Sequence, residues 1–160
     1  MPMFLFKKNK TALKAPENAA AKEPEWTQPY TTALRYRDVP VVISLDQEQS
    51  KPHVEEDFAV LTGAGIETLV REKLIPWIKG EQFPDREDEK IYTGLRLYEI
   101  DYSYSRIVAR YSPTGEDGLF GEFSLNYESA GDYTADMLEA VEMRVLVANG
   151  KIAGVRCFDV

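Results

Sequence analysis

The sequence has 160 residues, of which 44% are apolar and 29% charged; these proportions fit one folded domain and exclude a collagen-like, disulfide-rich or wholly disordered chain. The net charge of −8 argues against a nucleic-acid-binding protein, because contacts to phosphates need clustered Lys and Arg. One Cys and one His are too few for a His- or Cys-rich metal site within one chain, so we expect no metal and no cofactor.

The first 25 residues form the only basic segment of the chain and have no apolar periodicity. Three apolar residues at 4–6 precede the lysines, which is the reverse of the order in a secretory signal, and no run approaches the roughly 20 apolar residues of a membrane span. We therefore predict a cytoplasmic protein with a tail or linker over 1–25 and a single domain over 26–160. Five Lys and three Glu in the tail leave a net charge of −10 on that domain.

Two alternating stretches open the domain. Apolar or Thr side chains recur at every second position over 28–37 and again over 39–46, and Asp38 between them marks a turn. Pro40 lacks a backbone donor, so it should lie at an edge or a turn. We predict a two-stranded hairpin followed by an acidic loop over 46–57.

A helical pattern comes next, because apolar residues recur every three or four positions over about 57–79. Gly63 and Gly65 predict a break near its start. Pro76 predicts a kink near its end, since it cannot donate a hydrogen bond to the carbonyl of Glu72. We expect one main helix here, followed by a second acidic loop over 82–90.

The rest of the chain is rich in strand patterns, and the predicted strands are 92–105, 107–111, 119–127, 141–147 and 152–158. The apolar side changes near Tyr98, which predicts a bulge there. Asn149-Gly150 is a strong signal for a two-residue hairpin turn. We therefore predict an α+β domain in which an antiparallel sheet of about six or seven strands packs one face against the main helix.

The chain has many carboxylates but only one His and one Cys as candidates for a catalytic base or nucleophile. His53 lies in a predicted polar loop, which favours a solvated side chain over a general base. Cys157 lies in a predicted strand, where a free Cys is typically a small buried apolar residue. We predict no catalytic residue. An alternative remains open, in which Glu99 or Asp101 works with tyrosines in a ligand-binding or catalytic cleft beside the sheet.

Three tyrosines fall on one side of a single predicted strand, namely Tyr98, Tyr102 and Tyr104. They either pack under the helix or form a protein-binding face, since Tyr combines a large apolar ring with a polar tip and is enriched in interfaces. The charged candidates for the same interface are Glu87, Asp88 and Glu89 in the second acidic loop.

Four sequence features follow one another between Trp26 and Gly154. They are the opening hairpin, Leu74-Ile75-Pro76-Trp77, Leu95-Arg96-Leu97-Tyr98-Glu99-Ile100, and Gly115-Glu116-Asp117-Gly118-Leu119-Phe120-Gly121. This order resembles that of small bacterial domains of unknown function, some of them encoded beside polymorphic toxins and regarded as candidate immunity proteins. Those domains often have a His after the Phe-Gly pair, where this chain has Glu122. The resemblance implies a bacterial protein that neutralises a toxin, and it assigns no catalytic residue.

These observations together predict a non-catalytic protein-binding domain that acts as an immunity protein. Its acidic surface would attract a basic toxin at high association rates, whereas nucleic acid and a membrane span are not expected. The C-terminal hairpin adds a second expectation. The apolar stretch 152–155 would be weakly protected at a sheet edge, so two copies of the chain could pair there as a homodimer.

Overall fold

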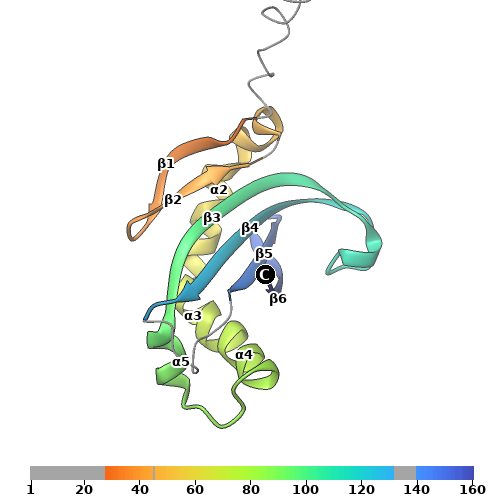
Figure 1. The fold of residues 1–160 in the computed structure, drawn as a ribbon. Helices are drawn as coiled ribbons and strands as arrows, with labels where there is room; N and C mark the ends of the chain where they lie inside the picture. Colours follow the sequence, from red (N-terminus) through yellow and green to blue (C-terminus); the bar gives the residue numbers. More distant parts are fainter. Residues whose placement is uncertain (1–27, 45, 132–139) are drawn as a thin grey trace, which may run out of the picture.

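The computed structural model describes residues 28–44, 46–131 and 140–160, so the predicted tail over 1–25 lies outside the described residues. The described chain has an α+β fold in which helices cover one side of a six-stranded sheet (Figure 1). The strands are β1 (Tyr30–Tyr36), β2 (Val39–Ile43), β3 (Leu95–Ile107), β4 (Gly118–Ser129), β5 (Val141–Ala148) and β6 (Lys151–Asp159). The helical elements are α2 (Gln47–Ala64), α3 (Ile66–Leu69), η2 (Val70–Leu74), α4 (Ile75–Glu81), α5 (Asp88–Gly94) and η3 (Ala109–Tyr111). None of these described helices is long and apolar enough to cross a membrane.

The strands lie side by side in their sequence order, from β1 to β6. Each neighbouring pair is antiparallel except β2 and β3, which are parallel. The prediction of a purely antiparallel sheet is therefore wrong at this pair. The reason is the connection between these two strands, which runs through the helices and returns the chain to the end of the sheet where β2 began, as parallel pairing requires.

The first helix begins at Gln47, although the sequence pattern predicts an acidic loop over 46–57. Gln47 and Ser50 are buried in its first turns, so polar residues occupy inward positions that an apolar periodicity does not reveal. The break predicted at the glycines is confirmed, because α2 ends before Gly65, which has a φ of 90°.

The single helix predicted over 57–79 is a succession of shorter segments. After α3 comes the π-helical turn η2, and Pro76 lies in the first turn of α4. Proline cannot donate to the carbonyl of Glu72, and a wider turn immediately before it is one way to accommodate the missing bond. The irregularity expected near Pro76 is therefore present. The loop predicted over 82–90 includes the start of a further helix, α5, at Asp88.

The hydrophobic core lies between the helices and one side of the sheet. It combines side chains of α2, α3, η2 and α4 with alternate residues of the strands. Its members include Phe58, Leu61, Leu74 and Ile78 from the helices and Ile100, Tyr102, Phe123, Met143 and Val145 from the sheet. Because side chains alternate along a strand, the neighbours of these strand residues face away from the helices.

The two longest strands, β3 and β4, run past the others as a curved hairpin whose end stands out at one side of the molecule (Figure 1). The pairing of β3 with β4 shifts between Leu97 and Glu99, which confirms the bulge predicted near Tyr98. Asn149 and Gly150 both have positive φ and join β5 to β6, which confirms the predicted turn.

The strand β6 is the last in the sheet, as the homodimer prediction requires. Within the described residues its outer edge makes no backbone hydrogen bond to another segment. Arg156, Asp159 and an irregularity in its pairing with β5 protect it in part. Pairing of two copies along this edge stays a prediction, which light scattering of the full chain at high concentration tests.

Candidate functional site

The candidate site lies on the side of the sheet that faces away from the helices, which we call the open face. Tyr102, Phe123 and Val145 point to the other side and have no exposed surface. On the open face, the pairing of strands sets up a row in which Asp101, Ser124, Arg144 and Arg156 lie next to one another, from β3 to β6. This row carries charges of both signs across four neighbouring strands.

The connection between β3 and β4 folds back over one end of the open face. A Cβ atom added to Gly154 of β6 would lie 3.1 Å from the Cβ of Pro113, so the glycine permits this close approach. Phe120 and Leu146 are buried, yet they lie outside the main core cluster. Both belong to the open face, so apolar side chains are also buried at this end of that face.

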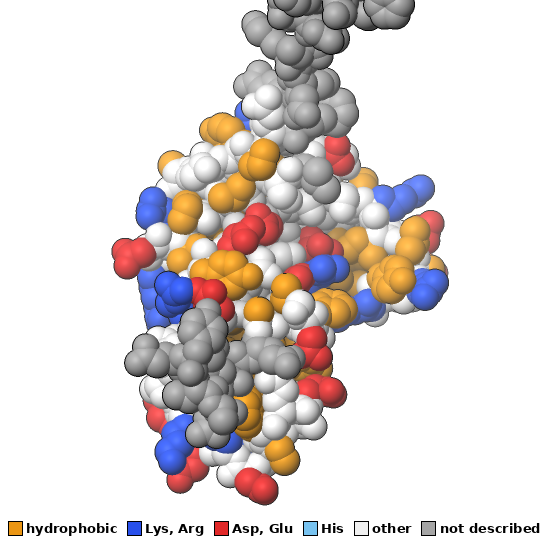
Figure 2. Space-filling view, viewed as in Figure 1, with side chains coloured by type: hydrophobic (Ala, Val, Ile, Leu, Met, Phe, Trp, Pro, Cys, Tyr) orange, Lys and Arg blue, Asp and Glu red, His pale blue; other side chains and the backbone are white. Residues whose placement is uncertain are grey.

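A hollow of about 360 Å³ lies where the hairpin end faces β5 and β6. Its apolar rim is formed by Val108 and Tyr111, each 50% exposed, and Phe158, which is 36% exposed. Leu119 is a further exposed apolar side chain on the hairpin, at 53%. Figure 2 shows hydrophobic side chains gathered over the hairpin with charged side chains among them. Exposed apolar clusters rimmed by polar residues are typical of interaction sites.

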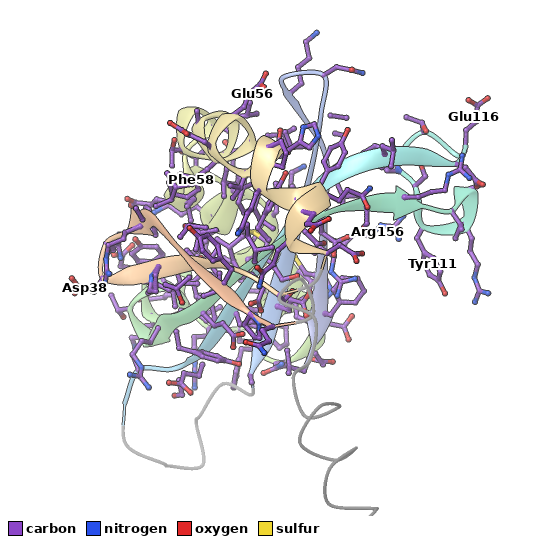
Figure 3. All side chains as sticks on the ribbon, turned by 90° about the horizontal axis from the view of Figure 1, so that it is seen from above. Asp38, Glu56, Phe58, Tyr111, Glu116 and Arg156 are labelled. Carbon is purple, nitrogen blue, oxygen red and sulfur yellow. The ribbon has the colours of Figure 1, made fainter. Side chains whose placement is uncertain are left out.

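Three arginines line the same hollow, namely Arg106, Arg144 and Arg156. Arg156 lies between the body of the sheet and the hairpin end that carries Tyr111, whereas Glu116 points outward from the tip (Figure 3). Arg144 and Arg156 face each other directly across β5 and β6. A local concentration of positive charge therefore exists on a chain whose net charge is −8.

The three arginines differ in whether carboxylates neutralise their charge. Arg144 forms ion pairs with Glu142 at 2.7 Å and with Glu122 at 3.5 Å, and its guanidinium lies 4.8 Å from the ring centre of Phe158. Burial raises the pKa of Glu122 above its ordinary value, while Arg144 acts in the opposite direction. Within the described part of the chain, Arg106 and Arg156 form no ion pair. Two cations at this site thus remain available to a ligand.

A group of carboxylates lies beside the arginines on the open face. Glu99 and Asp101 are alternate residues of β3, and Glu142 lies in β5. Burial, a hydrogen bond with Glu99 and the negative charge of Glu99 raise the pKa of Asp101 to about 7. Asp101 and Glu99 therefore lie close together, and within the described residues neither forms an ion pair with Lys or Arg. A positively charged group of a binding partner would be favoured at this point.

The raised pKa of Asp101 predicts a measurable pH dependence of stability. An unfolded Asp has a pKa of about 3.9, so between roughly pH 4 and 7 the folded protein holds a proton that the unfolded chain has released. The folded protein is therefore most stable, as far as Asp101 is concerned, below about pH 4, and it loses this contribution as the pH rises from about 4 to 7. Asp101→Asn should therefore be more stable than the wild type at pH 8, by about 1 kcal/mol after allowance for solvent screening of a half-exposed group. Urea unfolding between pH 4 and 8 measures this, with Glu116→Gln as the control; an unchanged pH profile would contradict it.

The three predicted tyrosines do not form one surface. Tyr98 is 40% exposed, Tyr102 is fully buried in the core, and Tyr104 is half-buried. The bulge in β3 separates Tyr98 from the other two. Tyr104 stacks on the ring of His53, with 3.7 Å between the ring centres. Only Tyr98 offers a large exposed ring, so the tyrosines cannot act together as the predicted binding face.

A polar cluster joins α2 to the core side of the sheet. The hydroxyl of Tyr102 donates a hydrogen bond of 2.5 Å to Oδ2 of Asp57, and the backbone N–H of Tyr104 donates to Oγ of Ser50 at 3.0 Å. Burial raises the pKa of Asp57, and the bond from Tyr102 and the proximity of His53 lower it. Because Ser50 is fully buried and Tyr102 has no exposed surface, this cluster is placed to hold the helix on the sheet.

The acidic candidates of the second loop belong largely to α5. Glu87 precedes this helix, and Asp88 and Glu89 lie in its first turn, where negative charge is favourable. Asp88 forms an ion pair with Lys79 at 2.7 Å, and Glu89 forms one with Arg71 at 3.1 Å. These two carboxylates therefore connect α5 with α4 and η2, which leaves Glu87 as the least engaged of the three.

A second hollow, of about 300 Å³, contains three tyrosines, Tyr36, Tyr92 and Tyr127. Arg37 in its wall donates a hydrogen bond of 3.4 Å to the hydroxyl of Tyr92. Neither Glu99 nor Asp101 lines this hollow or the one on the open face. The alternative that combined one of these carboxylates with tyrosines in a cleft therefore has no support from these two hollows.

Sequence reasoning missed the arginines and aromatic residues around the open-face hollow. Arg144 and Arg156 lie in two predicted strands whose pattern gives neither a role. The separate strand predicted over 107–111 is wrong, because β3 continues to Ile107 and Ala109–Tyr111 forms the helical turn η3. Burial raises the pKa of the Cys157 thiol to about 11, which disfavours the reactive thiolate. Among the described residues no group of three or more His, Cys, Asp or Glu is arranged to hold a metal ion.

Comparison with known proteins adds no relative to this picture. No protein-family model matches the chain, and neither a curated protein nor a solved structure matches it significantly. The resemblance to candidate immunity domains thus rests on the order of sequence features alone.

Proposed function

We propose that this chain is a non-catalytic protein-binding domain that binds its partner through the open face. The observation that carries the proposal is the group of exposed apolar side chains at the rim of the hollow, Val108, Tyr111 and Phe158, next to two arginines without ion pairs. Aromatic residues and Arg dominate the energetics of protein interfaces. Their presence in one concave site is therefore the arrangement that a partner protein would use.

The distribution of charge supports a protein partner over a small ligand. Arg106 and Arg156 line the hollow, and the open face presents the carboxylates Glu99 and Asp101 further along β3. A small anion would contact only the first group. A protein surface can contact both groups together and cover the exposed rings, which is the combination of apolar centre and polar rim that interfaces show.

We further propose that the partner is a toxin and that the chain acts as an immunity protein. Two observations support this: the order of sequence features from Trp26 to Gly154, and the net charge of −10 on residues 26–160. A strongly acidic domain would attract a basic toxin from a distance. Asp101 and Glu99 would then pair with Lys or Arg of that toxin, which would relieve the repulsion between the two carboxylates.

The proposal predicts that truncation of the exposed rings abolishes partner capture. Tyr111→Ala combined with Phe158→Ala should weaken binding by at least about 30-fold, because the loss of even one hot-spot aromatic side chain costs about 2 kcal/mol or more. The measurement is affinity capture from a lysate of the source organism by the tagged full chain, with quantification by mass spectrometry at low and high salt.

The matched control is Glu56→Gln, because Glu56 points outward from α2 on the other side of the sheet (Figure 3). A partner that the wild type and this control retain and the double variant loses would support the proposal. Growth of cells that co-express this partner, with and without the chain, tests whether it is a toxin. Equal capture by the double variant would contradict binding through the open face.

A further inference from the structure

This inference rests on the proposed function and concerns the chemistry of the partner. It begins with Arg144 and Arg156, which face each other directly across β5 and β6. Like charges at directly opposed positions destabilise a sheet. Such a pair is tolerated in a folded protein when nearby carboxylates neutralise it. The neighbours of the two side chains therefore determine how much positive charge remains at this point.

The available carboxylates neutralise only one member of the pair. Arg144 contacts Glu142 at 2.7 Å and Glu122 at 3.5 Å. Arg156 interacts electrostatically with Glu122 but forms no ion pair within the described chain. Arg106 on the opposite wall of the hollow also has no ion pair among the described residues. The hollow therefore has an excess of positive charge.

The surroundings of these cations strengthen their attraction for an anion. Leu146 at the hollow is 3% exposed, and Val108 and Tyr111 form apolar parts of its wall. Electrostatic attraction increases where apolar side chains displace water. The planar guanidinium group matches a carboxylate in geometry and binds it through two parallel hydrogen bonds.

We propose that the hollow binds the carboxylate of an Asp or Glu side chain in an exposed segment of the partner protein, with an apolar neighbour of that residue against Tyr111 and Phe158. Arg156 and Arg106 supply the positive charge that the free protein leaves unneutralised. The partner can still be basic as a whole. The acidic residues of the open face lie beside the hollow and would contact its Lys and Arg side chains.

The row across the sheet sets the spacing of the partner's charges. Asp101 and Arg156 lie three strands apart in this row. Neighbouring strands are about 4.8 Å apart, so the two charges are separated by about 14 Å, which an extended segment covers with about four residues. The partner segment should therefore carry Lys or Arg about four residues from its Asp or Glu.

Selection from a displayed random-peptide library against the full chain tests this without knowledge of the natural partner. We expect enrichment of peptides with an Asp or Glu next to an apolar residue and a Lys or Arg about four positions away. One such peptide, synthesised and labelled, should lose about tenfold or more of its affinity when its acidic residue is replaced by the amide. Arg156→Gln should cause a similar loss, whereas Arg35→Gln on β1 should leave the affinity unchanged.

A second measurement shows that Arg156→Gln acts on binding and not on folding. This variant removes the repulsion between Arg144 and Arg156, which offsets the loss of the attraction between Arg156 and Glu122, so its denaturation midpoint should not lie below that of the wild type. A lower midpoint together with lost binding would overturn the inference, as would selected peptides without acidic residues. Displacement of the peptide by inorganic phosphate or nucleoside triphosphate alone would assign the hollow to a small anion. Failure of the lysate capture, in contrast, concerns the proposed function and leaves the peptide result unaffected.

Discussion

Replacement of Gly121 by Ala is expected to destabilise the protein by about 2–4 kcal/mol, the range for overpacking combined with a broken buried hydrogen bond. An added Cβ at Gly121 would lie 2.8 Å from Cγ of Asp57 and 3.0 Å from the hydroxyl of Tyr102, and closer still to Oδ2 of Asp57. These are the two groups that form the 2.5 Å hydrogen bond between α2 and β3. The added methyl group therefore forces the helix and the sheet apart at the bond that joins them.

The control for this experiment is the same substitution at Gly63. This glycine lies inside α2, is exposed and has nothing within 4 Å of an added Cβ. Alanine favours a helix over glycine by about 1 kcal/mol, so Gly63→Ala should stabilise the protein. Urea unfolding of the two variants should thus give changes of opposite sign. Loss of less than about 0.5 kcal/mol in Gly121→Ala, the usual scale of neutral surface changes, would contradict the expectation.

A double variant identifies the source of the effect. In Asp57→Ala the carboxylate that occupies the space beside Gly121 is absent, although the Tyr102 hydroxyl loses its acceptor. Addition of Gly121→Ala to this background should therefore cost less than it does in the wild type. Residues in direct contact show coupling of about 0.5–3 kcal/mol in such cycles. Additive effects would place the strain elsewhere.

The positions of several strands could be predicted from the sequence, because the alternation of apolar and polar residues depends only on the local pattern. Alternation located β1, β2 and β4 to within a few residues, and Asn149-Gly150 located the turn between β5 and β6. The change of apolar side near Tyr98 correctly indicated the bulge in β3. The parallel pairing of β2 with β3 was beyond such reasoning, because it depends on the path of a long connection and not on either strand.

The arginine pair could not be predicted for a similar reason. The turn at Asn149 and Gly150 pairs Val147 with Ile152, and uninterrupted pairing would place Arg156 on the core side, opposite Met143. An irregularity in the pairing after Val147 shifts the register by one residue and turns Arg156 to the open face. A shift of one residue exchanges the two sides of a strand, and its position is set by packing.

The tyrosines show the limit of periodicity as a guide to function. The pattern placed Tyr102 and Tyr104 on one side of a strand correctly, but it did not show that this side packs against α2. Polar residues of the helix, Ser50 and Asp57, accept the hydrogen bonds from this strand. Because those residues lie in a predicted loop, the sequence offers no hydrogen-bond partner for the Tyr102 hydroxyl. The pattern alone therefore does not distinguish a buried tyrosine from one in a protein-binding face.

Tyr102→Phe is expected to destabilise the protein by about 1–3 kcal/mol at neutral pH, because it removes the donor and leaves the half-buried carboxylate of Asp57 without its bond. The hydroxyl lowers the pKa of Asp57 against the opposing effect of burial, so its loss should raise that pKa further. The folded variant would then bind a proton at a higher pH than the folded wild type does. Its deficit should therefore shrink as the pH falls towards about 4, the ordinary range for Asp.

The control is Tyr98→Phe, which makes the same chemical change in the same strand. Tyr98 is 40% exposed, and its hydroxyl has no hydrogen-bond partner among the described residues, so its removal should change stability by less than about 0.5 kcal/mol. Urea unfolding of wild type and both variants at pH 4, 5.5 and 7 separates the outcomes. A deficit of Tyr102→Phe that is equal at all three pH values would show that the lost interaction is one of packing. A deficit that decreases towards low pH would show that the ionised carboxylate of Asp57 depends on the tyrosine.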